Sequence, residues 1–364
     1  MVSRLADTGP ATQLLTTAPD GSSARYLGRI GPVANIVYGD TLAGGPEQLT
    51  CTVQADPSRQ DDALAPGRLV RGIRGASIIW EGTLDQPVPG DDGWELTASG
   101  AGTWGSKFRA VYTSWTGENV IDTAISNGLR WIRGTVSGGY LAEPRDSASI
   151  SVTEFLNLIT SPGSKTWHVT RTPAGLKVNL IDIPTTPTRI LITDVPSVRT
   201  LAGYINVLRV RYQATADTGS VPATYGLAVA YNPDAKTKYG VSEQYWDLSP
   251  AGVITYSAAG AYGVAALNKY TDAFWGSPLT ISPGQYLTMG GVPVDLGCEK
   301  AGEVARLVLA DGPYSGQLSP TPVTFPVGKI SYNNSTGTAQ VTPFQSVATD
   351  WSSLLDILAP KAPA

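Results

Sequence analysis

The sequence predicts a mainly β chain, with an α+β domain in the middle and a small β-barrel domain on either side of it. Three features of the composition support this fold class. The 364 residues include 40 Gly and 27 Pro, more than the average usage of about 7% and 5%, so turns are frequent. Charged residues make up only 15% of the chain, whereas hydrophobic residues make up 42%. Such a chain is apolar enough to fold, and its turns favour short strands over long solvated helices.

The length predicts two or three domains at about 150 residues each. We expect an N-terminal β-barrel in residues 1–115, an α+β middle domain in 116–195 and a second β-barrel region in 196–345. A helical segment at about 257–275 is inserted in the second barrel region, and residues 346–364 form a C-terminal docking helix and tail.

The N-terminal region has the pattern of a small antiparallel barrel or sandwich. Leu49, Cys51 and Val53 alternate with polar residues, which is the period of a half-buried strand. Pro-Gly and Asp-Gly turns separate this strand from other strand candidates. These candidates are Val33–Tyr38, Arg68–Ile73, Ala76–Glu81 and the alternating set of Trp94, Leu96 and Ala98.

The middle region carries local helix signals. Thr116 can cap a helix from Glu118 to Asn127 that stops at Gly128. Ser151 and Glu154 form a capping box for a second helix, which ends before Pro162–Gly163. Beyond it, two strands form a hairpin around Thr172–Gly175. They are Trp167–Arg171 and Leu176–Ile183.

Strands return in the third region and surround one helix. The small residues Ala259 and Gly263 lie on one face of a predicted helix at Ser257–Trp275 and allow close backbone approach. A short amphipathic helix follows Asp350 and ends before Pro360; it is too short to be stable alone, so it docks on its own body or on a partner. The predicted strands are Ile205–Gln213, Tyr225–Tyr231, Glu303–Ala310 and Val327–Tyr332.

Two turns in the β regions resemble each other. Pro66–Gly67 and Pro283–Gly284 both stand directly before a predicted strand. Pro-Gly turns are common in this composition, so chance is one explanation. The other is that the two β regions are copies of one barrel.

Candidate catalytic groups are few. His168 is the only histidine and lies in a predicted strand between Trp167 and Val169. A general base needs a nucleophile or an orienting carboxylate beside it, and no G-x-S-x-G, S-x-x-K or H-x-x-E pattern supplies one. We therefore expect a structural histidine, no catalytic residues and no enzyme activity.

No metal, cofactor or disulfide is expected. A Cys/His zinc site needs about four ligands, more than one His and two Cys provide. The first ten residues lack the apolar core of a signal peptide, so we expect Cys51 and Cys298 to be two separate reduced thiols. A disulfide between them is the alternative.

Two acidic pairs, Asp61–Asp62 and Asp91–Asp92, lie in Pro/Gly-rich loops. Glycosidase chemistry needs two carboxylates facing each other about 5–10 Å apart, and adjacent residues at a loop tip do not provide that arrangement. We expect solvated turns, with a cation site as the alternative.

The net charge of −4 is spread evenly along the chain, which disfavours binding to nucleic acid or to an anionic membrane surface. No stretch approaches the ~20 apolar residues that cross a bilayer, so no membrane span is expected. Arg68, Arg71 and Arg74 follow one predicted hairpin close to acidic residues. We interpret them as an intermolecular salt-bridge face, with phosphate contacts as the alternative.

The chain also contains nine Trp and 16 Tyr. Trp80, Trp94 and Trp167 occupy alternating strand positions, where core or interface anchors are expected. A carbohydrate-stacking platform is the alternative.

Several segments resemble a known family. Gly67–Gly82, GRLVRGIRGASIIWEG, resembles the strand–turn–strand ending in Trp-x-Gly of phage tail-hub barrels. Gln244–Ser249 leads into the Ala-rich helix, and Gly284–Leu296 and Gly302–Val308 follow. This order is similar to the minor tail proteins of long-tailed actinobacterial phages, which resemble baseplate hub proteins. The excess of Arg over Lys agrees with a high-GC genome.

The resemblance implies a structural virion protein: a homotrimeric hub ring at the distal end of a phage tail. Two barrels of tail-hub type per chain would give six per ring, which can mate with a sixfold tail tube. The ring would link the tail tube or distal tail protein to tip or receptor-binding proteins. DNA and the tape measure would pass through its channel without specific binding. The protein would be assembled in the host cytoplasm and reside at the tail tip of the virion.

Three other functions stay open at this stage. One is a hexameric distal tail ring protein with a single barrel of this type. Another is a carbohydrate-binding or receptor-binding tail protein. The third is a tail-associated cell-wall hydrolase, for which the catalytic residues are missing.

Overall fold

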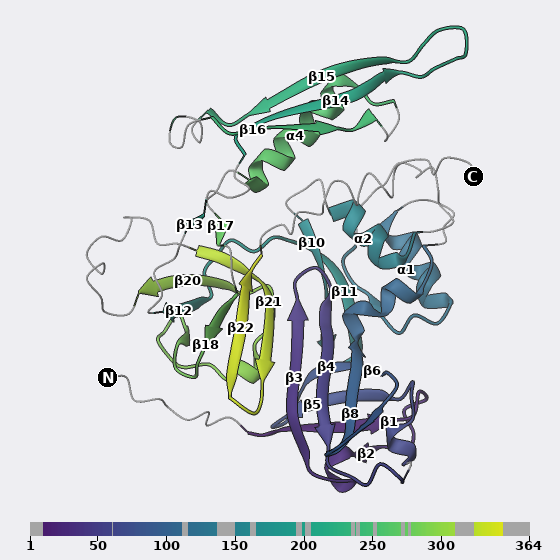
Figure 1. The fold of residues 1–364 in the computed structure, drawn as a ribbon, viewed down its shortest axis with the longest axis vertical. Coiled ribbons are helices and arrows are strands. Elements are labelled where there is room, and N and C mark those ends of the chain that lie inside the picture. Colours follow the sequence, from purple (N-terminus) through teal and green to yellow (C-terminus); the bar gives the residue numbers. More distant parts are fainter. Residues whose placement is uncertain are drawn as a thin grey trace.

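The computed structural model describes residues 10–59, 61–110, 116–136, 150–160, 165–193, 199–200, 205–233, 237, 241–249, 253–270, 274–275, 278–309 and 324–344. They form three units, each with its own apolar core: a large sheet, an α+β unit beside it and a smaller sheet-and-helix unit at one end of the molecule (Figure 1). The mainly β prediction is confirmed.

The large sheet contains 14 strands from both ends of the chain. Its N-terminal strands are β1 (Thr12–Thr17), β2 (Arg25–Tyr26), β3 (Val33–Thr41), β4 (Gly45–Val53), β5 (Leu69–Arg74), β6 (Ser77–Leu84), β7 (Val88–Gly90) and β8 (Gly93–Gly100). Its C-terminal strands are β12 (Arg189–Thr193), β18 (Leu279–Ile281), β19 (Tyr286–Thr288), β20 (Val304–Leu309), β21 (Thr324–Asn333) and β22 (Thr338–Pro343). Short 3₁₀ helices, η1 (Leu27–Arg29), η2 (Asp62–Leu64) and η5 (Leu296–Cys298), lie between these strands, and η3 (Ala101–Lys107) leads from β8 into the α+β unit.

The two ends of the chain meet where β3 pairs antiparallel with β21, in the register Lys329↔Thr41 to Asn333↔Val37. The strand β21 serves two sets of neighbours. Its first part pairs with β20 and its second part lies between β22 and β3, with a register shift at Val327/Lys329. Gly328 occupies this shift, and a Cβ there would lie 2.6 Å from the Cα of Phe344. Glycine therefore allows β21 to bend from one part of the sheet into the other.

Two separate closed barrels, which the sequence predicted, are not found among the described residues. The strand order runs β19-β12-β20-β21-β3-β4-β8-β6-β5-β1-β2, and within the described residues this path does not close on itself. The N- and C-terminal strands share one apolar core, in which Tyr38 and Tyr332 are cross-strand partners with ring centroids 5.5 Å apart. Each half thus satisfies an edge strand by pairing with the other half.

The two similar turns have the same backbone form. Gly67 and Gly284 have φ angles of +85° and +84°, a region that glycine enters without steric cost. In each turn the residue after the glycine donates its N–H to the carbonyl three residues earlier, at 3.4 Å before β5 and 3.1 Å before β19. That the two regions are copies of one barrel stays a prediction.

The α+β unit forms where the local signals predicted it. It contains α1 (Gly117–Ser126), β9 (Ile132–Arg133), α2 (Val152–Thr160), β10 (Lys165–Thr172) and β11 (Gly175–Asp182). The capping box is present: the N–H of Ser151 donates to Glu154 at 2.6 Å, and the N–H of Glu154 donates to the Ser151 hydroxyl at 3.2 Å. Thr116 accepts from the N–H of Asn119 as the cap of α1.

The third unit differs from the expected arrangement. Residues predicted as part of a second barrel form a separate sheet, β15-β14-β16, with α4 packed on one face. The bounds are β14 (Val207–Thr215), β15 (Thr224–Tyr231), β16 (Glu243–Asp247) and α4 (Tyr256–Tyr270). A short pair, β13 (Arg199–Thr200) with β17 (Phe274–Trp275), joins the segments that enter and leave the unit.

The third unit forms its own core because α4 packs closely on its sheet. Ala259, Gly263 and Leu267 of α4 are buried against β14 and β15. A Cβ on Gly263 would lie 2.9 Å from the Cβ of Ala230, so the close approach of helix and strand uses the small-residue face that the sequence indicated. The expected boundary at residue 195 falls just after β12, which the structure pairs with β19 and β20 of the large sheet.

The C-terminal helix within 346–364 and the end of the second helix at Pro162–Gly163 fall outside the described residues. The helix predicted at Ser257–Trp275 is described as far as Tyr270, and its last two residues instead pair with β13 as β17. Among the described helices, none combines the length and apolar character required to traverse a bilayer.

Candidate functional site

Buried polar contacts connect distant parts of the chain, and the first is centred on Arg74 of β5. Its side chain is only 1% exposed, and its Nε lies 2.7 Å from a carboxylate oxygen of Asp295. The guanidinium lies over the ring of Tyr332, 5.1 Å from the centroid, and donates to the side-chain oxygen of Asn334 at 3.3 Å. Because these partners lie more than 220 positions away in sequence, Arg74 joins the N- and C-terminal halves of the sheet.

The backbone of Gly297 lies directly against the side chain of Arg74. A Cβ on Gly297 would lie 2.7 Å from the Nε of Arg74, so only glycine fits there. The carbonyl of Gly297 accepts a hydrogen bond from the hydroxyl of Tyr38 at 2.7 Å. Burial raises the pKa of this Tyr38 hydroxyl, which therefore stays protonated as a donor.

The second contact places His168 at the joint of the α+β unit. His168 on β10 is 5% exposed, and its Nε2 lies 2.9 Å from Oδ1 of Asp40 on β3. The same oxygen accepts the N–H of Ala301 at 3.0 Å. Next to it, the N–H of Val169 donates to the carbonyl of Gly44 at 2.9 Å. Three segments far apart in sequence thus converge on one carboxylate.

The arrangement around His168 fits a structural role. Asp40 is the kind of orienting carboxylate that a general base uses. In the described part of the chain, however, the recorded side-chain hydrogen bond of His168 goes to Asp40, and no hydroxyl or thiol shares it. A nucleophile for a catalytic pair is therefore not brought to the ring.

The third contact corrects the interpretation of the arginine row as an intermolecular face. Arg71 on β5 and Arg171 on β10 both bind the carboxylate of Glu81 on β6, which is 4% exposed. Arg68 is 9% exposed and donates to the carbonyl of Ser23 at 2.5 Å. The partners of these arginines therefore belong to the same chain, although Arg71 and Arg74 lie on opposite faces of β5.

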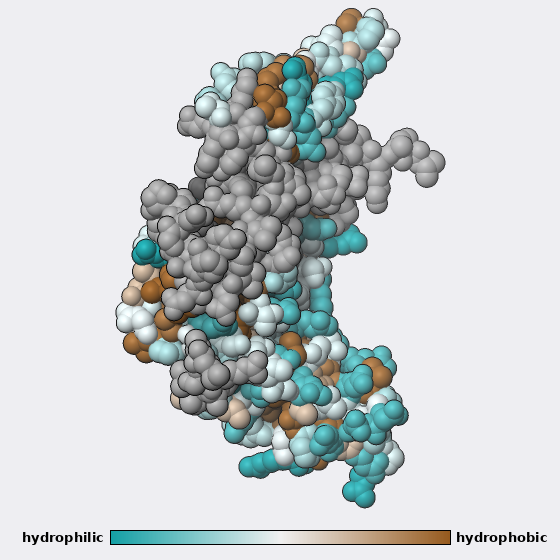
Figure 2. Space-filling model, turned by 60° about the vertical axis from the view of Figure 1, so that its left-hand side comes forward, coloured by the Kyte–Doolittle hydropathy of each residue, from teal (hydrophilic) through white to brown (hydrophobic). Residues whose placement is uncertain are grey.

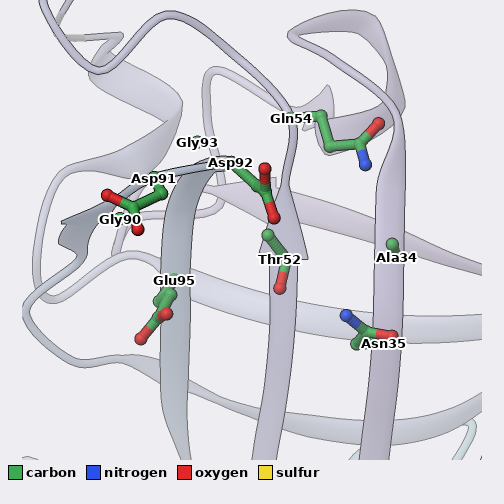
Figure 3. A pocket seen from close by; sticks show the side chains of 9 residues that line it. All are labelled: Ala34, Asn35, Thr52, Gln54, Gly90, Asp91, Asp92, Gly93 and Glu95. Atoms are coloured by element: carbon green, nitrogen blue, oxygen red, sulfur yellow. The ribbon is translucent and has the colours of Figure 1, made fainter.

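The acidic pairs do not form a common site. Asp61 caps η2 by accepting the N–H of Ala63 and is paired with Arg25 at 2.8 Å. Asp91 and Asp92 lie at the β7–β8 turn beside a polar hollow, and their carboxylates point to different sides of it (Figure 3). Within the described ranges, no group of three or more His, Cys, Asp or Glu side chains could hold a metal ion.

The cysteines are separate free thiols, Cys51 buried and Cys298 exposed. Burial raises the pKa of the Cys51 thiol to about 12. Partial burial, and then the charge of Asp295, raise the pKa of the Cys298 thiol to about 11. A thiol that stays protonated is a poor nucleophile, so both thiols are expected to react slowly at neutral pH.

The predicted tryptophans are core residues rather than a sugar-binding platform. Trp80, Trp94 and Trp167 are 2%, 9% and 0% exposed. Apart from Tyr26 of β2, at 38% exposure, the exposed aromatic side chains of the described residues lie on the third unit. Those of β15 and β16 are Tyr225, Tyr231 and Tyr245, at 51%, 65% and 54% exposure.

We call the outward side chains of β15 the β15 face: Tyr225, Leu227, Val229 and Tyr231, all between 44% and 65% exposed. They alternate with the inward Gly226, Ala228 and Ala230, which lie on the side of the sheet that α4 covers. Figure 2 shows apolar surface beside strongly hydrophilic surface on this end of the molecule. A strand that is apolar on both faces is typical of one covered on both sides, and this pattern in Thr224–Tyr231 is the sequence signal that could have indicated a surface for assembly.

The chain resembles known proteins in its three-dimensional structure. No family model matches the chain, and no curated protein matches it. The 43 kDa tail protein of prophage MuSo2 from Shewanella oneidensis superposes with a TM-score of 0.61 at 12% identity, covering 95% of this chain and 99% of that one. The chain has a tail-protein fold.

Two further solved structures share this tail-protein fold. Prophage tail protein gp18 from Listeria monocytogenes has a TM-score of 0.58 at 8% identity and covers 95% of this chain and 99% of that chain. A tail protein from Neisseria meningitidis has a TM-score of 0.55 at 12% identity, with 92% and 95% coverage. The likeness therefore extends over nearly the whole length of each protein.

Proposed function

We propose that this chain is a structural component of a phage tail, in which three copies form a hub ring at the distal end. The observation that carries the proposal is the fold likeness to tail proteins over 92% to 95% of the chain. The ring links the tail tube or distal tail protein to tip or receptor-binding proteins. It is assembled in the host cytoplasm and becomes part of the tail tip.

The internal contacts support a rigid building block. Arg74, Asp40 and Glu81 are each 8% exposed or less, and each is held by partners from distant parts of the chain. Removing one partner from a buried ion pair is costly, so these contacts resist relative movement of the units. A ring that transmits force between tube and tip benefits from such stiffness.

The same proposal makes the protein a non-enzyme with no cofactor. Its polar clusters are occupied by partners within the chain, as at His168 and Asp40. The net charge of −4 suits a channel that lets DNA pass without binding it.

Immunogold electron microscopy of virions tests the position. Antibody against the chain should label the end of the tail distal to the capsid. Labelling along the tube, on the capsid or on side fibres would contradict the proposal. Clearing of purified host cell walls by the protein alone would contradict its non-enzymatic part.

A further inference from the structure

The β15 face is an apolar surface whose neighbouring charges are already paired. On β14, Arg209 is paired with Glu243 of β16, and Arg211 is paired with Asp247 at 3.1 Å. The guanidinium of Arg211 also lies over the ring of Tyr225, 4.4 Å from its centroid. A nucleic acid or another highly charged partner would find no free cation or anion in this ladder. The partner that fits is therefore uncharged and apolar.

The edge of β15 also lacks the features that keep strands apart. Thr224–Tyr231 contains no charged residue and no proline, whereas native edge strands are usually protected by Lys, Pro or inward-pointing charges. The opposite edge, β16, carries Glu243 and Asp247. Both edge strands are exposed, but only β15 presents an uncharged row of exposed side chains, since the exposed Tyr245 of β16 is flanked by Glu243 and Asp247.

A surface of matching chemistry lies on the other side of the same unit. The outward positions of α4, which we call the α4 face, are Ser257, Ala261 and Val264, all exposed. No charge interrupts them, and Val264 is 51% exposed. Beside them, a Cβ on Gly260 would meet no atom within 4 Å. Apart from Tyr256, which is 64% exposed at the start of the helix, these outward side chains are small enough to receive large side chains of a neighbour.

We infer that the β15 face of one copy packs against the α4 face of the next copy. Both surfaces belong to one unit at the end of the molecule (Figure 1), so a neighbour can reach them. Because they are different surfaces, the contact is head-to-tail, and head-to-tail contacts close into rings when the rotation between copies allows it. The inference rests on the proposed hub ring and supplies one of its contacts.

Cysteine cross-linking tests this contact directly. In a Cys298→Ser background, one chain carries Val229→Cys on the β15 face and a differently tagged chain carries Val264→Cys on α4. We expect mild oxidation to produce a disulfide-linked dimer from the mixture, none from either chain alone, and a ladder up to three copies from a chain with both substitutions. Val88→Cys, at a site 53% exposed in β7, replaces Val229→Cys as the control and should give no product with Val264→Cys.

Charge substitution gives a second readout. Val229→Glu should lower the fraction of trimer at fixed concentration at least about tenfold, since a carboxylate would lose its hydration inside an apolar contact. Val88→Glu should leave that fraction unchanged.

The possible results distinguish a failure of the proposed contact from a failure of the proposed hub ring. If the wild type is trimeric but no mixed disulfide forms, the proposed contact is wrong and the proposed ring still holds. The same applies if Val229→Cys forms a disulfide with a second copy of itself. A wild type that stays monomeric overturns both. Binding of host cell-wall polysaccharide that is lost in Tyr225→Ala, without any mixed disulfide, would reassign the β15 face to sugar recognition and overturn the inference.

Discussion

The imidazole of His168 and the carboxylate of Asp40 lie 2.9 Å apart although 128 positions separate them in sequence. Together with the N–H of Ala301, they join the α+β unit to both halves of the large sheet. Replacing Asp40 removes the carboxylate that holds the buried His168 ring, and replacing His168 leaves the Asp40 carboxylate with the N–H of Ala301.

We therefore expect His168→Ala to lower the free energy of unfolding by about 3 kcal/mol. Calorimetry should show a lower Tm for the main transition. In a double-mutant cycle, Asp40→Ala should destabilise the His168→Ala variant much less than it destabilises the wild type. Additive losses would show that the two residues do not interact.

Arg74→Met should also destabilise the protein, by about 3–5 kcal/mol, because it leaves Asp295 without its cation. The control is Arg59→Met, since Arg59 is 87% exposed on its side chain and lies 3.8 Å from Asp56. The control should leave the Tm unchanged. Equal effects in thermal unfolding would contradict the role assigned to Arg74.

The contact between the α+β unit and the β3–β4 turn depends on Gly45. It has φ of +122°, and a Cβ there would lie 2.6 Å from the carbonyl oxygen of Val169. Gly45→Ala should therefore cost more than Gly67→Ala, where φ is +85° but the space is open. We expect about 1 kcal/mol for Gly67→Ala from backbone strain alone.

Hydrogen exchange locates the effect of these glycine substitutions. Gly45→Ala should speed exchange of amides in β10, whereas Gly67→Ala should leave β10 protected. The reverse pattern would mean that Gly45 does not set the contact.

The thiol of Cys298 should react slowly despite its exposure. Because its pKa is raised to about 11, the reactive thiolate is scarce at neutral pH and increases as the pH rises toward that value. At pH 8 we expect alkylation roughly a hundredfold slower than that of an ordinary thiol of pKa about 8.5. Rates followed by mass spectrometry should rise steadily to pH 10. A plateau below pH 9 would contradict the assigned environment.

Local sequence signals predicted local structure well. The helix caps at Thr116 and Ser151 and the hairpin at Thr172–Gly175 depend on neighbouring residues alone, and the structure has all three. The alternation of Leu49, Cys51 and Val53 likewise corresponds to β4.

Long-range pairing could not be predicted in this way. The contact between β3 and β21 joins residues almost 300 positions apart, and no local pattern specifies it. The strands β18 and β19 have three residues each, too few to show a period. The interpretation of the arginines of β5 was wrong because the acid that holds Arg74, Asp295, lies 221 positions away at the start of η5, and Glu81 on β6 also binds Arg171 of the α+β unit.

The mass of the native particle tests the central claim most directly. Native mass spectrometry of the full-length protein should show three copies of the 38.2 kDa chain. A particle of six copies would favour a distal tail ring instead, and a monomer at every concentration tested would contradict the ring altogether.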